Sequence, residues 1–355
     1  MVSMLETMFR AAALAPLTEP SLLQRIESLP GWEGSNIARA AVVKAMELST
    51  QTNAASYLDN TDFVYKNEMM ELQEVLGARV VATYKQTKQV WIEWRVAKDN
   101  LDDRQAMLFR QSTELLSAKL AMPFSRQLNL VDCIGIIRQR HDSRHLGLVC
   151  TASIILPPRT LIYLIGKRED QEPPLEEKFR LARYFAASLA GLHAAGWIHR
   201  AFRSDNILCS GEDLEDLAAL KTPIVSGFES TRQVGMESIN NRPNGGGQMD
   251  YYYHPDICNG FSKAMDLYSL GVLLLEIAYW KPLYKRLRKA NTNTLEGIKD
   301  LFLQSARESL PAMMGSIYAG VVLCCLECRL SDKDDVKFAS DVNSEIIYRL
   351  NLCRA

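Results

Sequence analysis

The ten residues 199–208, His-Arg-Ala-Phe-Arg-Ser-Asp-Asn-Ile-Leu, hold the side chains with the most evident chemistry in this chain of 355 residues. Asn206 offers an oxygen that could bind Mg²⁺, but Mg²⁺ prefers carboxylate and phosphate oxygens, so one neutral amide is poor support. Asp205, beside it, carries a carboxylate. Ala201 has only a methyl group, which can neither accept a proton nor orient a substrate hydroxyl. The segment therefore has no general base at its centre.

Three further segments follow: Ile-Val-Ser-Gly-Phe-Glu at 224–229, Tyr-His-Pro-Asp at 253–256, and a largely apolar run at 266–277 that begins with an aspartate. In this order the four segments resemble the catalytic loop (His-Arg-Asp), the Asp-Phe-Gly motif, the Ala-Pro-Glu motif and the central helix of protein kinases. The resemblance covers about residues 67–350 and is sharpest over 180–280. It implies an α+β, bilobal protein kinase-like fold, with a small β-rich lobe and a mainly helical large lobe.

The resemblance assigns catalytic roles by position. Four residues align with the catalytic loop: His199, Arg200, Ala201 at the degenerate base position, and Arg203. Asn206 aligns with one metal ligand, but Gly227 stands at the second metal position, where a kinase has an aspartate. Glu229 lies two residues further on and could swing in, and Asp205 could replace the missing base. We expect neither, and we expect Mg²⁺ to bind poorly.

The positions that would hold a nucleotide are also altered. Gly77 is the first glycine of the Gly-rich loop, whereas Arg79 and Ala82 replace the other two. Arg79 could bind phosphate or belong to an ordinary hairpin. Aligning residues 92–95 with Val-Ala-Ile-Lys puts Arg95 at the position of the phosphate-binding lysine. Strand alternation directs Glu93 to the same face, where it either pairs with Arg95 in the cleft or forms an exposed cross-strand pair.

Other residues would support the site. The resemblance makes Glu114 the helix partner of the strand cation, Asp266 a brace for the catalytic loop, and the loop histidine a structural contact of Phe228. Asp256 stands for the glutamate of Ala-Pro-Glu, and Arg329 is the nearest candidate for its arginine partner.

Apolar periodicity predicts the elements that position these residues. We expect strands over 75–82, 89–96, 133–138 and 146–152, and helices over 102–120, 175–195 and 266–280. The predicted organisation is a helical N-terminal extension (1–66), a kinase-like N-lobe (67–153) and a kinase-like C-lobe (154–355).

A narrower resemblance is carried by residues 90–95, Gly-Trp-Ile-His at 196–199, Val-Ser-Gly-Phe-Glu at 225–229 and the Tyr-His-Pro-Asp ending. Together they resemble filamentous-fungal kinase-like domains, which often follow a helical HeLo (prion-inhibition) domain. Residues 1–66 are too short for a complete HeLo bundle, so they are either a truncated one or an unrelated extension.

The composition restricts the class of protein. The net charge of −1 gives no global attraction to nucleic acid. The eight cysteines show no disulfide framework, and the lone Cys-x-x-Cys at 325–328 fits buried thiols. No secretory signal and no apolar run of about 18 residues is evident. We expect an intracellular, cytoplasmic protein with protein partners and no membrane span.

The sequence therefore predicts a catalytically impaired pseudokinase, a signalling or scaffold module, in fungal cell-death or incompatibility signalling by analogy. The alternative is a divergent kinase that binds ATP through Arg95 and Asn206 and has weak Ser/Thr phosphotransferase activity. A third interpretation treats the domain as the remains of a longer protein whose function lies in a missing N-terminal effector, with residues 1–66 as an interaction helix pair.

Overall fold

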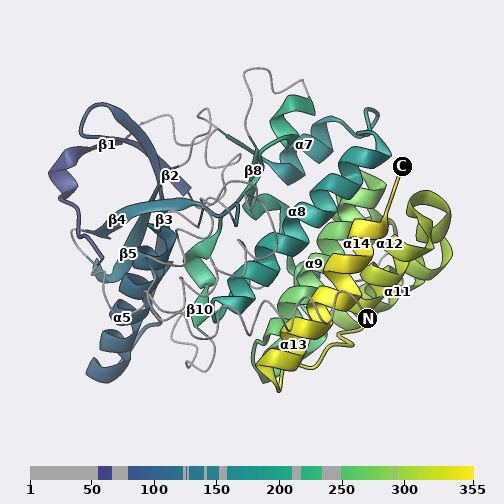
Figure 1. Ribbon diagram of the computed structural model, residues 1–355. Helices are drawn as coiled ribbons and strands as arrows, with labels where there is room; N and C mark the ends of the chain where they lie inside the picture. The colour runs from purple at the N-terminus through teal and green to yellow at the C-terminus, as the bar shows by residue number, and fades with distance from the viewer. Residues whose placement is uncertain are drawn as a thin grey trace, which may run out of the picture.

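The computed structural model describes residues 55–65, 79–122, 125, 128–139, 142–151, 158–209, 217–233, 249–290, 292 and 294–355. The protein has a β-rich small lobe, which carries one long helix, and a mainly helical large lobe (Figure 1). This is the bilobal, α+β kinase-like fold that the sequence predicts. Gly77 and residues 1–54 lie outside the described residues.

The small lobe is a five-stranded antiparallel sheet in the order β1-β2-β3-β5-β4. Its strands are β1 (Phe63–Tyr65), β2 (Arg79–Tyr84), β3 (Lys88–Val96), β4 (Asp132–Gln139) and β5 (Asp142–Thr151). Helix α5 (Asp103–Leu120) packs against β4 and β5, and Asp102 and Gln105 begin it with a reciprocal capping box. The sheet begins before residue 67, because β1 pairs with β2.

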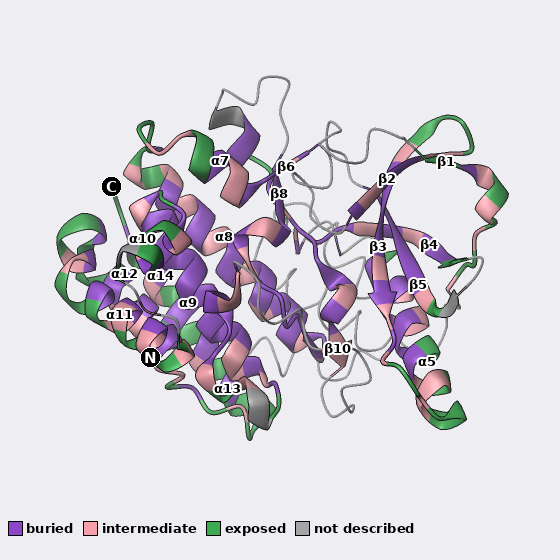
Figure 2. Cartoon of the chain, turned by 180° about the vertical axis from the view of Figure 1, so that it is seen from behind, coloured by how far each residue is buried: buried purple, intermediate pink, exposed green. Residues whose placement is uncertain are grey.

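The large lobe is built around α9 (Lys263–Tyr279), which packs against α8 (Leu175–Ala194) and α12 (Leu310–Leu326). Nearly every residue of α9 is buried, as its apolar sequence predicts (Figure 2). Further helices of this lobe are α7 (Leu161–Lys167), α10 (Leu283–Ala290), α11 (Leu295–Glu308), α13 (Asp335–Val342), the π-helix η8 (Asn343–Tyr348) and α14 (Arg349–Leu352).

Short strands fix the loop that carries the candidate site. The catalytic-loop segment runs from β7 (Trp197–Ile198) through the 3-10 turn η3 (Ser204–Asn206) to β8 (Ile207–Cys209). Strand β7 pairs with β10 (Arg232–Gln233), and β8 lies between β6 (Arg159–Thr160) and β9 (Ile224–Val225). The Ser-Gly-Phe segment therefore leaves β9 directly beside the catalytic loop.

The described helices include no single one long and apolar enough to cross a membrane. Only α11 and α12 taken together pass such a test, and they are bent by 103° at their junction. The Cys-x-x-Cys motif lies at the end of α12, with Cys325 fully buried as a free thiol and Cys328 partly buried.

Candidate functional site

Asp266, in the first turn of α9, holds the backbone of the catalytic loop. Its carboxylate accepts hydrogen bonds from the backbone N–H of His199 at 2.7 Å and of Arg200 at 2.8 Å. The ring Nε2 of His193 lies 2.9 Å from the same carboxylate. Arg200 has a φ of 67°, in the left-handed region, so the loop turns sharply where Asp266 anchors it.

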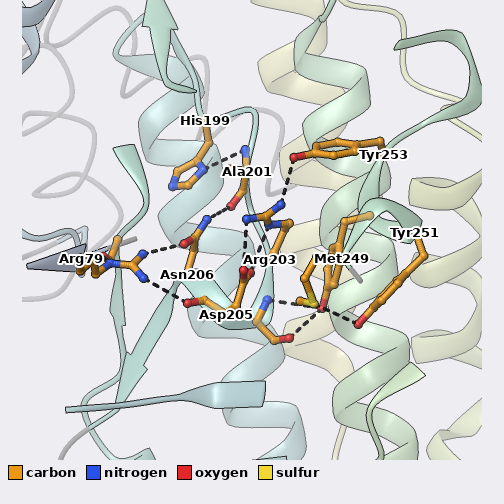
Figure 3. A network of polar contacts seen from close by, with 12 residues as sticks. Arg79, His199, Ala201, Arg203, Asp205, Asn206, Met249, Tyr251 and Tyr253 are labelled. Atoms are coloured by element: carbon orange, nitrogen blue, oxygen red, sulfur yellow. Dashed lines mark hydrogen bonds and ion pairs between the residues drawn. The ribbon is translucent and has the colours of Figure 1, made fainter. Parts of the chain in front are cut away.

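A hydrogen bond between Asn206 and Ala201 spans the catalytic loop. Ala201 is 1 % exposed, and its carbonyl accepts a hydrogen bond of 2.8 Å from Asn206 Nδ2 (Figure 3). The amide nitrogen of Asn206 thus braces the loop, and its Oδ1 is left facing the small lobe. Nothing at position 201 can accept a proton from a substrate.

Arg79 of β2 reaches that oxygen from the small lobe. Its Nη2 donates to Asn206 Oδ1 at 2.6 Å, and its Nη1 lies 3.4 Å from the Asp205 carbonyl oxygen (Figure 3). Its Nε donates to Ser226 Oγ at 2.9 Å and to Glu93 Oε1 at 3.1 Å. One guanidinium therefore joins β2, β3, the catalytic loop and the segment after β9.

Glu93 is the acceptor at the centre of this cluster. Its carboxylate accepts from the backbone N–H of Gly227 at 3.0 Å and of Phe228 at 2.8 Å, and from the Ser226 hydroxyl. Trp91 Nε1 donates to it at 3.1 Å. Burial disfavours the carboxylate, but the charge of Arg79 and these donors outweigh it, so the pKa of Glu93 lies below its usual value.

Glu93 pairs with Arg79, which lies opposite it on β2, and not with Arg95; the pair is cross-strand, but it is buried and not exposed. The Arg79 and Glu93 side chains are 5 % and 2 % exposed. Arg95 points to other acceptors: its Nη1 donates to the carbonyls of Phe228 at 2.7 Å and Thr231 at 2.9 Å. Its Nε donates to Thr113 of α5 at 3.1 Å. Burial lowers the pKa of Arg95 to about 10.

This geometry favours a different register for β3. A kinase lysine and the Asp of Asp-Phe-Gly both face the nucleotide phosphates. Glu93 contacts Ser226 and the backbone N–H of Gly227, at the position of the metal aspartate, whereas Arg95 reaches the same segment at the carbonyl of Phe228. This difference favours aligning residues 90–93 with Val-Ala-Ile-Lys. Trp91, which is 1 % exposed, then stands where the small residue beside adenine would be. The sequence could not choose between the registers, because Glu93 and Arg95 share a strand face.

The structure does not bring Glu114 to these cations. Glu114 Oε1 accepts a hydrogen bond from Tyr57 at 2.6 Å, away from Arg95, whose α5 contact is Thr113. The Asp256–Arg329 pairing is also absent from the described contacts. Arg329 pairs with Glu327 in the same turn, and the carboxylate of Asp256 lies 3.6 Å from His254 Nδ1.

Gly227 stands at the second metal position and has no room for a ligand. Its φ is 86°, and a Cβ placed on it would lie 2.2 Å from Asn206 Cγ. Across the described residues, His, Cys, Asp and Glu form no group of three or more that could hold a metal ion. Introducing an aspartate here would therefore need a rearrangement of Asn206.

Arg203 forms an ion pair with Asp205, the carboxylate of the catalytic loop. Its guanidinium grips Asp205 with two bonds of 3.1 Å and donates to Tyr253 Oη at 3.0 Å (Figure 3). A bidentate arginine pair of this kind is strong and directional. Glu229 is half-buried; desolvation raises its pKa, and the Glu93 charge raises it further. The carboxylate of Asp205 is therefore engaged by Arg203 and does not replace the missing base.

His199 has a structural environment. Its Nδ1 lies 3.3 Å from the Ala201 N–H, and its ring packs on the Phe228 ring with centroids 4.9 Å apart. Burial lowers the pKa of His199 to about 4, despite the nearby charge of Asp266. The ring is therefore neutral at pH 7, and it links the catalytic loop to the Ser-Gly-Phe segment.

A further buried carboxylate, Glu276 of α9, received no role in the sequence analysis. It accepts hydrogen bonds from Tyr252 Oη at 2.7 Å, Tyr251 Oη at 3.0 Å and the backbone N–H of Leu283 at 3.0 Å, and from the Ser204 hydroxyl. Burial raises the pKa of Glu276, which its four donors oppose. A lone carboxylate within an apolar helix was the available signal, because it must find donors when it is buried.

Comparison with known proteins gives partial similarities to protein kinases. No protein-family model matches the chain. A probable serine/threonine-protein kinase of Dictyostelium discoideum, kinY, is 26 % identical over 156 residues, which are 43 % of this chain and 25 % of that protein. A probable myosin light chain kinase of the same organism is 24 % identical over 210 residues, 53 % of this chain and 61 % of that protein.

The chain thus spans only a quarter and about three fifths of the lengths of these two relatives. They lend no support to the fungal, HeLo-linked group. Together with the bilobal fold, the similarities support a relationship between this chain and the protein kinase-like superfamily.

Proposed function

We propose that this kinase-like domain is a pseudokinase, a signalling or scaffold module that works through protein partners and not through phosphoryl transfer. The observation that carries the proposal is the Arg79–Glu93 pair. It joins Asn206 and Ser226 in the region between β3 and the catalytic loop, where a kinase holds phosphates and metal ions. The guanidinium of Arg79 thus occupies the Asn206 oxygen that a bound metal ion would need.

Three further features support the proposal. Ala201 supplies no base. Gly227 supplies no metal ligand and cannot gain one without displacing Asn206. With residues 90–93 aligned to Val-Ala-Ile-Lys, the buried Trp91 takes the position of the small residue that packs beside adenine. Phosphoryl transfer depends on positioning and charge stabilisation by these parts, so their joint loss is expected to lower the rate by several orders of magnitude.

A second candidate is a divergent protein kinase with ATP binding and weak Ser/Thr phosphotransferase activity. It is favoured by the retained His199, Arg203 and Asn206 and by the names of the two Dictyostelium relatives. Under this candidate Arg79 would release Asn206 when MgATP arrives. A fungal cell-death role and an intracellular location stay predictions from the sequence.

Phosphotransfer with labelled ATP, measured as autophosphorylation and on a generic basic substrate protein, separates the two candidates. The pseudokinase proposal predicts no incorporation by the wild type beyond that of a heat-inactivated sample. It also predicts none by Ala201→Asp, which restores the base alone. Incorporation that rises in Ala201→Asp would support the weak kinase and overturn the pseudokinase proposal.

A further inference from the structure

A concentrated positive charge lies on the large lobe, outside the candidate site. Five of the nine residues from Lys281 to Lys289 are basic and none is acidic. The whole chain has 41 basic and 42 acidic residues, so the rest of the protein is net acidic. Helix α10 carries most of this segment, on the helical side of the molecule away from the small-lobe sheet (Figure 2).

The fold turns these cations outward. Leu283 and Leu287 of α10 are 2 % and 8 % exposed and belong to the core, so the helix is anchored by its apolar face. Lys285 and Arg288, three residues apart, share the opposite, exposed face. Lys281, just before the helix, is also exposed. We call Lys281, Lys285, Arg286 and Arg288 the α10 basic surface.

Aromatic rings hold two of these cations in place. The guanidinium of Arg286 lies over the Tyr279 ring, 4.8 Å from its centroid, and that of Arg288 lies over the Tyr284 ring at 5.5 Å. A guanidinium that rests on a ring keeps its N–H edge available and loses less side-chain freedom when it binds an oxyanion. The surface is therefore prepared for planar oxyanions such as carboxylates.

The protein itself shows a carboxylate on this surface. Glu169, in the turn after α7, forms an ion pair with Lys285, and its neighbour Asp170 is exposed. Among the four residues of the α10 basic surface, Lys285 alone forms an ion pair with a carboxylate of the described residues. The contact between Glu169 and Lys285 therefore shows, with one side chain, how a carboxylate of a bound peptide would engage this surface.

We propose that the α10 basic surface is a docking site for an acidic peptide segment of a partner protein. A row of cations along one helix matches the spaced carboxylates of an extended acidic chain. The buried Leu283 and Leu287 leave α10 without an apolar side to insert into a lipid bilayer, which favours a peptide over a membrane. The inference is independent of whether the candidate site binds nucleotide.

The test is fluorescence anisotropy of a labelled deca-glutamate peptide titrated with the full chain at low salt. We expect saturable binding that weakens at least about tenfold in Lys281→Glu/Lys285→Glu/Arg288→Glu, because charge reversal replaces attraction with repulsion. The matched control, Lys88→Glu/Lys221→Glu/Lys333→Glu, changes the same charge at exposed positions elsewhere and should bind like the wild type. Circular dichroism checks that both variants fold.

Three results would overturn the inference. Equal loss in both triple variants, or no binding by the wild type, would mean that α10 is only a solvated charged face. Binding to phosphatidylserine vesicles that depends on α10, without peptide binding, would assign the surface to an anionic membrane instead.

Discussion

Replacing Arg79 by methionine tests how strongly the two lobes depend on the buried ion pair. The substitution removes the cation but keeps most of the side-chain length. It leaves the Glu93 carboxylate, 2 % exposed, without its counter-charge, and Asn206 Oδ1 without its 2.6 Å donor. Breaking a buried pair by removing one partner costs about 3–5 kcal/mol, because the remaining charge stays desolvated. We expect Arg79→Met to lower the free energy of unfolding by about that amount.

The assay is reversible urea unfolding at pH 7, followed by circular dichroism, as a double-mutant cycle with Glu93→Gln. The double variant should recover much of the loss, because no unpaired charge remains. The exposed pair Lys337–Asp341, with a separation of 3.7 Å, is the control. Lys337→Met should cost only about 0.3–0.5 kcal/mol. A cost for Arg79→Met below about 1 kcal/mol, or strict additivity in the cycle, would refute the reasoning.

Three further predictions concern neighbouring parts of the site. Gly227→Ala should cost about 1–3 kcal/mol more in urea unfolding than Gly196→Ala, because both have φ near 80° but only the first Cβ collides with a side chain; equal costs would contradict this. The pKa of His199, about 4 in the folded protein and about 6.5 unfolded, implies stability that is present above pH 6.5 and lost as the pH falls toward 4. In unfolding curves measured at the same series of pH values, the free energy of unfolding of His199→Gln should fall by up to about 3 kcal/mol less than that of the wild type between pH 6.5 and 4. Identical pH profiles for the two proteins would contradict this prediction. Tyr252→Phe removes the 2.7 Å donor to Glu276 and should cost about 1–3 kcal/mol at pH 7, whereas a neutral effect would mean that the carboxylate is satisfied without it.

The sequence predicted the elements well because they carry long, regular apolar patterns. The helix expected over 102–120 is α5 (Asp103–Leu120), and the strand expected over 89–96 is β3 (Lys88–Val96). These patterns are local, so one chain suffices to find them. The edge strand β1 was missed because three residues are too few to show a period.

The chemistry between the lobes was harder to predict. Arg79 and Asn206 are 127 positions apart, and no local pattern pairs them. Their contact exists only because β2 begins beside the catalytic loop in the folded molecule. Sequence alignment also favoured Arg95, since a cation was expected at the lysine position. In the structure, the β3 residue that contacts the Ser-Gly-Phe segment as the kinase lysine would is Glu93, and its partner is Arg79 of β2. A negative charge therefore stands where a positive one was expected.

The most direct test of the central claim is a thermal-shift titration of the purified chain with ATP, with and without Mg²⁺. A ligand that binds only the folded state at about 100 times its Kd would add about 2.7 kcal/mol to the stability. We predict no shift under either condition, because Arg79 already occupies the side-chain oxygens of Asn206 and Ser226. A Mg²⁺-dependent shift of the wild type, lost in Asn206→Ala, would show that the site accepts MgATP and would contradict the account.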